Sequence, residues 1–78
     1  MKKYHVVFCV SVGSSTECYY CITESDLNKD DLHEEIGKML LDNKFIYANS
    51  DPDRVNDGKK TSYLIKTDRI YCVNVSEK

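Results

Sequence analysis

The sequence predicts an α+β fold with the element order β-β-α-β-β-β, in which a mainly antiparallel sheet has one helix packed on one face. Three observations support this prediction. Residues 27–43 have the spacing and end signals of a helix. The segments on either side alternate in polarity, are rich in Val, Ile and Tyr, and end at turn signals, as strands do. The length of 78 residues fits a single small domain over residues 1–78.

Residues 4–12 and 16–23 are the first two predicted strands. They are joined at Gly13 and Ser14, which suit the central pair of a type II′ turn. This turn pairs residues whose numbers sum to 27. Both faces of the hairpin are then largely apolar. One helix covers one face only, so the second face requires a strongly curled sheet or a partner molecule.

The helix is expected to run from Lys29 to Asp42. Asn28 is a good N-cap, and Asn43 can take the left-handed conformation that commonly follows a helix. Gly37 weakens the helix by about 1 kcal/mol and is a candidate point of close approach to a strand or to a second copy. The face that packs on the sheet is an apolar stripe at helical spacing, formed by Leu32, Ile36, Met39 and Leu40.

The second half of the chain reads as three further strands. Residues 44–49 form the third predicted strand, and a long polar loop over residues 50–59 follows it. Residues 60–66 and 69–75 are predicted to form a second hairpin around residues 67–68. Long loops in compact domains are often functional, so the loop is a candidate functional segment.

Charge and hydropathy argue against two classes of partner, nucleic acids and membranes. The net charge is −2, and residues 24–57 hold ten acidic and four basic residues. Without a dominant basic surface, nucleic acid is not an expected partner. No apolar run approaches the roughly 18–20 residues that span a membrane, and the first residues lead into strand-like alternation rather than a signal peptide. A cytoplasmic location without membrane contact is therefore predicted.

Residue usage favours an AT-rich genome, on the codon table rather than on physical grounds. Residues with AT-rich codons (Phe, Tyr, Met, Ile, Asn and Lys) number 29, and those with GC-rich codons (Gly, Ala, Arg and Pro) number 7. This bias fits a low-GC bacterium, or a phage or mobile element that lives in one. A short acidic chain fits the phage hypothesis, which would place the protein in the host cytoplasm.

The four cysteines, Cys9, Cys18, Cys21 and Cys72, are predicted to be free, buried thiols. The hairpin register places Cys9 beside Cys18 with His5 on the same face, so zinc binding and a disulfide are the alternatives. Cys18 and Cys21 form a C-x-x-C motif, but within a strand they point to opposite faces, unlike a redox motif. Phosphate loops and nucleophile elbows do not occur, so the prediction is no enzyme, no metal and no cofactor.

The first functional hypothesis is a small, non-enzymatic interaction or inhibitor protein. On this hypothesis it acts as a homo-oligomer and binds a host protein. Six tyrosines without a tryptophan suit an interface, because each buries a ring and keeps a polar group. The acidic face of the helix could meet a basic partner, as a nucleic-acid mimic does. Its predicted binding residues are Asp31, Glu34 and Glu35.

The alternative hypothesis is a binding protein that sequesters a small molecule, such as a nucleotide. Tyrosine rings would stack on the base, and basic side chains would meet the phosphates. The predicted binding tyrosines are Tyr20, Tyr47 and Tyr71. The predicted phosphate contacts are Lys66 and Arg69, together with Lys59 and Lys60.

Overall fold

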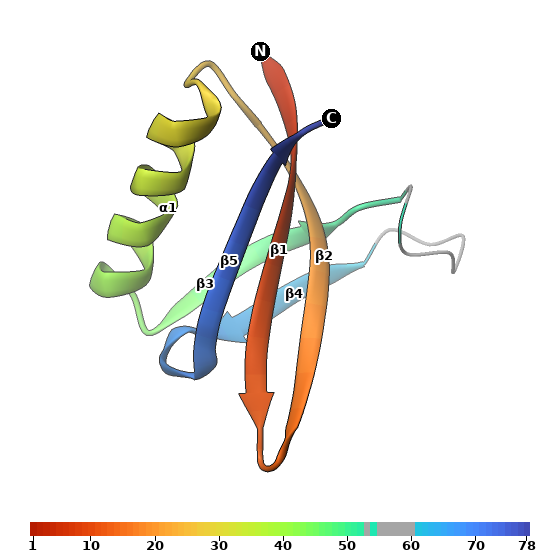
Figure 1. The fold of residues 1–78 in the computed structure, drawn as a ribbon, viewed down its shortest axis with the longest axis vertical. Helices are drawn as coiled ribbons and strands as arrows, with labels where there is room; N and C mark the ends of the chain where they lie inside the picture. Colours follow the sequence, from red (N-terminus) through yellow and green to blue (C-terminus); the bar gives the residue numbers. More distant parts are fainter. Residues whose placement is uncertain (53, 55–60) are drawn as a thin grey trace.

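The computed structural model describes residues 1–52, 54 and 61–78. In these ranges five antiparallel strands form one sheet with one helix, so the predicted α+β class and element order are confirmed (Figure 1). The elements are β1 (Lys2–Val12), β2 (Ser15–Ser25), α1 (Lys29–Asp42), β3 (Phe45–Ser50), β4 (Ser62–Lys66), the 3-10 turn η1 (Thr67–Arg69) and β5 (Ile70–Glu77). Most of the predicted loop over residues 50–59 and the first residue of the predicted strand, Lys60, lie outside the described residues.

The first hairpin has the predicted register. Val12 pairs with Ser15, and each further pair along β1 and β2 sums to the same number, down to Lys2 with Ser25. Gly13 has a φ of +59°, whereas no other type of residue in the described ranges has a positive φ. A type I′ turn needs positive φ at both central residues, so the turn fits the predicted type II′.

The predicted second hairpin is wrong. The strand order is β4-β3-β2-β1-β5, so β4 pairs with β3, β5 pairs with β1, and the two lie at opposite edges of the sheet. The turn between them explains the difference. The Thr67 backbone N–H donates to the Lys44 carbonyl at 2.9 Å, and the Thr67 hydroxyl donates to the Asn43 carbonyl at 2.6 Å. These bonds hold η1 against the connection between α1 and β3, and β5 leaves toward β1.

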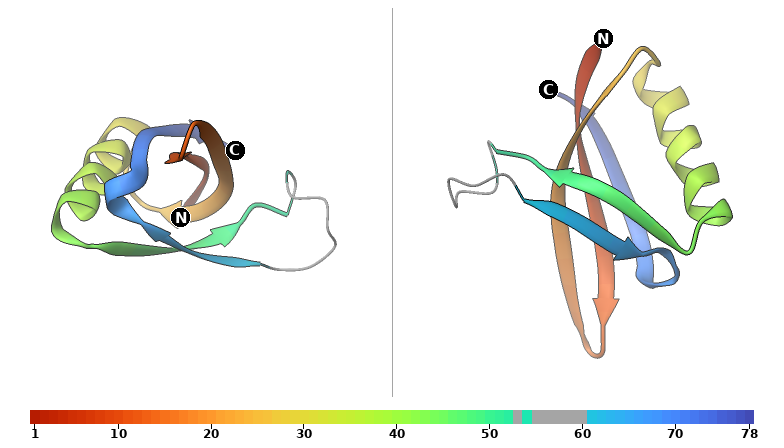
Figure 2. Two further views of the ribbon diagram at one scale, coloured as in Figure 1. Left: turned by 90° about the horizontal axis from the view of Figure 1, so that it is seen from below. Right: turned by 180° about the vertical axis from the view of Figure 1, so that it is seen from behind.

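The short η1 connection requires a curled sheet. Four inter-strand spacings separate β4 from β5, which is about 19 Å across a flat sheet. A 3-10 turn rises about 2 Å per residue, so it covers only about 8 Å between the ends of the two strands. The edges therefore approach each other at this end, and Figure 2 shows the sheet wrapped into an open, barrel-like curve. The sheet does not close, and α1 contacts β5 and β3.

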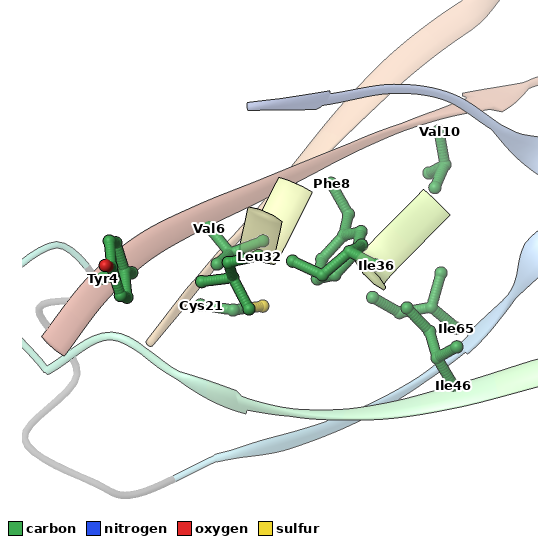
Figure 3. Close-up of a cluster of buried hydrophobic side chains, with 9 residues drawn as sticks. All are labelled: Tyr4, Val6, Phe8, Val10, Cys21, Leu32, Ile36, Ile46 and Ile65. Carbon is green, nitrogen blue, oxygen red and sulfur yellow. The ribbon is translucent and has the colours of Figure 1, made fainter. Parts of the chain in front are cut away.

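The core fills the concave side of this curve. Alternate residues of β1 point inward, and the Tyr4 ring is fully buried with its hydroxyl donating to the Leu27 carbonyl at 2.5 Å. Two residues of the predicted stripe on α1, Leu32 and Ile36, are buried against this row. Figure 3 shows the cluster, which consists of Tyr4, Val6, Phe8, Val10, Cys21, Leu32, Ile36, Ile46 and Ile65. Curvature and one helix together cover the concave face.

Helix α1 has the predicted bounds, and its N-cap is confirmed, since the Asn28 side chain accepts from the Asp31 backbone N–H at 2.8 Å. The predicted left-handed conformation of Asn43 is wrong, because its φ and ψ are −126° and 141°. Its side-chain amide instead donates to the Met39 carbonyl at 2.9 Å, which satisfies a carbonyl at the helix end. Within the described residues nothing lies close to Gly37, since an added Cβ would meet no atom within 4 Å. Among the described helices, none is long and apolar enough to cross a membrane.

The two edges of the sheet differ. Helix α1 packs along β5, where the His33 Nε2 atom lies 2.9 Å from the Val73 carbonyl oxygen. This contact occupies an edge carbonyl that would otherwise be open to another strand. Strand β4 pairs on one side with β3 and, within the described ranges, with no strand on the other. The β4 edge is therefore the one available for pairing.

Candidate functional site

Strands β3 and β4 carry apolar side chains on both faces. Their inward residues, Ile46 and Ile65, face each other and belong to the core. Their outward residues are also apolar: the exposed fractions are 51% for Phe45, 69% for Tyr47 and 70% for Leu64. Register places Tyr47 opposite Leu64 and Phe45 opposite Lys66. We call this surface the β3–β4 outer face, formed by Phe45, Tyr47, Leu64 and Lys66.

The apolar surface continues onto the end of α1. Leu41 is 87% exposed and lines a surface hollow together with Phe45 and Lys66. At the opposite end, the Tyr47 hydroxyl donates to the Ser62 hydroxyl oxygen at 2.7 Å, which adds a polar margin. Contiguous exposed apolar side chains with a polar margin are typical of a protein interaction surface.

A second feature is an apolar cleft between α1, β2 and β3. It forms because β2 and β3 pair only at Cys21 with Ser50 and at Ile22 with Asn49, and then separate. The cleft has a volume of about 220 Å³, and Met39 and Tyr47 line it. Small-molecule sites typically have volumes of about 300–1,000 Å³, so the cleft is small for a nucleotide.

The predicted binding tyrosines lie on three separate surfaces. Tyr47 is on the β3–β4 outer face, whereas Tyr20 is on the convex side of β2, with the Arg54 guanidinium 5.7 Å from its ring centre. Tyr71 is exposed where the pairing of β5 with β1 shifts by one residue, which is a β-bulge. The three rings therefore do not form one stacking platform.

The predicted phosphate contacts are partly grouped with Tyr47. Lys66 lies on the same outer face, and its ammonium is 3.6 Å from the Asp68 carboxylate. Arg69 is exposed at the end of η1. Lys59 and Lys60 lie outside the described residues. The structure thus brings together one predicted tyrosine, Tyr47, and one predicted cation, Lys66. Phe45 and Leu64 lie beside them and were not predicted as site residues.

The predicted acidic residues lie together on the exposed face of α1. Asp31, Glu34 and Glu35 line one shallow surface with Leu27 and Lys38. The Lys38 ammonium is 3.7 Å from the Glu34 carboxylate, the helical ion pair that the spacing predicts. This acidic surface is separate from the β3–β4 outer face.

Sequence reasoning also missed a buried contact between a histidine and a carboxylate. The Asp51 side chain is fully buried after β3, and its carboxylate pairs with Nδ1 of His5 on β1. The Asp51 backbone N–H donates to the Tyr20 carbonyl at 2.9 Å. Burial raises the pKa of the nearby Cys21 thiol to about 11, and the Asp51 charge adds to this shift. The spacing of residues 5 and 51 contains no signal of this contact, which depends on the tertiary fold.

Three cysteines form a row across the convex side of the sheet. Cys9 pairs with Cys18 on one side and with Cys72 on the other, and the sulfurs of Cys9 and Cys18 are 3.1 Å apart. All four thiols are free, but Cys18 is exposed and Cys72 is half-buried, which corrects the prediction that every cysteine is buried. In the part of the chain that the structure describes, no three side chains of His, Cys, Asp or Glu are arranged to hold a metal ion.

Comparison with known proteins identifies no relative: no family model, no curated protein and no solved structure matches the chain. The fold and its surfaces are therefore the basis for a functional proposal.

Proposed function

We propose that the protein is a small, non-enzymatic interaction protein that acts as a homo-oligomer and binds a host protein. The observation that supports this proposal is the exposure of Phe45, Tyr47 and Leu64 on one side of β3 and β4. Burying the part of each side chain that is still in water would contribute about 1–2 kcal/mol. A surface of this kind is best explained by an occupant that covers it.

The occupant that we propose for the β3–β4 outer face is a second copy of the chain. A two-fold contact brings the same surface of each copy together. The apolar part is uncharged, and its margin carries both Lys66 and Asp68. Two copies would therefore bury the apolar side chains without opposing a block of like charge. The acidic surface of α1 remains free in such a dimer.

The test is the mass in solution of wild type and of Leu64→Lys, measured by light scattering over a range of protein concentrations. We expect a dimer or larger oligomer for wild type and a monomer for Leu64→Lys, because a charge would be buried without a partner. Val12→Lys is the matched control, since Val12 is exposed at the tip of the hairpin, away from β3 and β4. A monomeric wild type, or an equal effect of both variants, would contradict the proposal.

For the host protein we propose a basic surface that meets Asp31, Glu34 and Glu35. Their clustering on one side of α1 supports this step. A triple reversal to lysine should abolish capture of the host protein that the wild type binds. The control reverses Glu24 and Glu77, exposed acids on β2 and β5.

Residue usage adds the interpretation that the chain is a phage inhibitor that acts in the host cytoplasm. The cytoplasm is a reducing compartment, and free thiols fit such a compartment.

Nucleotide sequestration is the second candidate. One observation favours it, namely that Tyr47 and Lys66 lie on the same face. A nucleotide that stacks on Tyr47 should raise the melting temperature, and Arg69→Ala should reduce this shift. If no nucleotide shifts the melting temperature of wild type, this candidate is eliminated.

A further inference from the structure

The row of cysteines offers a chemistry that neither functional candidate uses. Cys9 lies at the centre of the row on β1, and Cys18 on β2 faces it with a sulfur–sulfur distance of 3.1 Å. Only a further approach of about 1 Å is needed for a disulfide bond, which is about 2.05 Å long. Cys21 lies on the concave side, in the core, so it is separated from this row by the sheet.

The backbone geometry also permits this bond. In a hairpin with a two-residue turn, directly facing pairs alternate between hydrogen-bonded and non-hydrogen-bonded, starting with the hydrogen-bonded pair Val12 and Ser15. Cys9 and Cys18 are three pairs further, so they form a non-hydrogen-bonded pair. In such pairs the Cα atoms are about 4.5 Å apart, within the range of about 4.4–6.8 Å found for disulfides. Rotation of the side chains can therefore close the bond without moving the strands.

We propose that Cys9 and Cys18 form a thiol–disulfide exchange site that is oxidised by a low-molecular-weight disulfide, RSSR. In the first step the Cys18 sulfur attacks one sulfur of RSSR, which forms a mixed disulfide on Cys18 and releases one RSH. In the second step the Cys9 sulfur attacks the Cys18 sulfur, which forms the Cys9–Cys18 bond and releases a second RSH. Two protein thiols are oxidised, and one RSSR is reduced to two RSH that carry the two thiol protons.

The order of the steps follows from exposure and protonation. Cys18 is exposed, whereas Cys9 is buried, so an external disulfide reaches Cys18 first. Hydrogen bonding to Cys18, together with burial, raises the pKa of Cys9 to about 11. Cys9 therefore keeps its proton at neutral pH and reacts poorly with external reagents. Once Cys18 carries the mixed disulfide, Cys9 is the adjacent thiol that can displace RSH.

Cys72 provides the matched control. It faces Cys9 from β5, on the side opposite to Cys18, and its sulfur lies 3.9 Å from the Asn74 side-chain oxygen. Cys72→Ser removes one thiol of the row but leaves the Cys9–Cys18 pair intact. Cys9→Ser and Cys18→Ser each remove one member of the pair.

The experiment uses glutathione disulfide as the oxidant of the folded full-length chain at neutral pH. Thiols are then blocked by alkylation, and the products are identified by mass spectrometry of the intact protein and its peptides. For wild type and Cys72→Ser we expect a monomer-mass product that has lost two hydrogen atoms and links the peptides of Cys9 and Cys18. Cys9→Ser should stop at one glutathione on Cys18, and Cys18→Ser should react at least tenfold more slowly than wild type.

Three results would overturn the proposal. They are free thiols in wild type after equilibration with excess glutathione disulfide, a bond that maps to Cys9 and Cys72, and a disulfide between two chains. Circular dichroism establishes that each variant is folded. If a serine variant does not fold, the test is made on wild type by comparing the alkylation rates of Cys18 and Cys9. The proposal requires Cys18 to react first. The readout is the thiol content, so the result does not depend on whether the chain forms oligomers.

Discussion

At the scale of single residues, Gly37 weakens α1 without a structural need for glycine. A Cβ at this position would meet no atom of the described residues within 4 Å, and the residue has no positive φ. Gly37→Ala should therefore stabilise the fold by about 0.5–1 kcal/mol, because alanine has a higher helix propensity and a less flexible unfolded state. The measurement is the urea midpoint of unfolding at equilibrium.

Gly13→Ala is the matched control for that prediction, since Gly13 has a φ of +59° and open space around it. It should destabilise the fold by about 1 kcal/mol, because an L-residue is disfavoured in this conformation. If Gly37→Ala also lowers the urea midpoint, the helix has a neighbour at this position that the fold of a single copy does not contain.

The Cys21 thiol makes stability depend on pH in the alkaline range. Burial, together with Asp51, raises the pKa of this thiol from 9.0 to about 11. Between these values the folded state holds the proton that the unfolded state loses, so the free energy of unfolding decreases as pH rises. Below pH 9 this contribution is fully present. Cys21→Ala should reduce the decrease between pH 9 and pH 11, measured by urea unfolding at each pH. Equal slopes for both proteins would show that Cys21 does not carry the effect.

At the scale of elements, local sequence signals predicted which helices and strands form. They did not always predict which strands pair with each other. The hairpin of β1 and β2 was predictable in register, because a two-residue turn at Gly13 determines which residues face each other. The turn predicted at residues 67–68 lies within η1, yet β4 and β5 pair with other strands. Turn propensity is local, whereas the partner of a strand depends on contacts between residues far apart in the chain.

The same limit applies to the candidate site. Tyr47 and Lys66 were predicted because tyrosine and lysine are binding residues by type. Phe45 and Leu64 have the composition of core residues, and alternation alone cannot tell which of two apolar faces the core occupies. The exposure of the acidic residues of α1 was predictable, because helical periodicity indicates the exposed side of a helix, whereas their role in binding stays a prediction.

Thr67 is the residue through which η1 is held in place. Its hydroxyl donates to the Asn43 carbonyl at 2.6 Å, which ties the turn to the end of α1. Thr67→Val keeps the shape but removes the donor, so it should destabilise the fold by about 1 kcal/mol. Thr16→Val, on the exposed part of the first hairpin, should change stability by less than about 0.5 kcal/mol. Urea unfolding of both variants measures the difference, and equal losses would contradict the role of η1.

At the scale of the whole molecule, the curled sheet and one helix bury the concave face and leave the β3–β4 outer face exposed. A chain of 78 residues has a limited core, so a second copy would add a substantial share of its buried apolar surface. Association that occurs only between folded chains stabilises the folded state by mass action. The melting temperature of wild type should therefore increase with protein concentration.

Leu64→Lys removes the proposed contact but changes a side chain that is mostly in water in a single copy. Its melting temperature should be independent of concentration and should match that of wild type at high dilution. Val12→Lys should retain the concentration dependence. Differential scanning calorimetry over a hundredfold range of concentration measures all three proteins. A wild-type melting temperature that stays constant over this range would mean that the exposed apolar face serves a different partner, and that the fold is stable as a single copy.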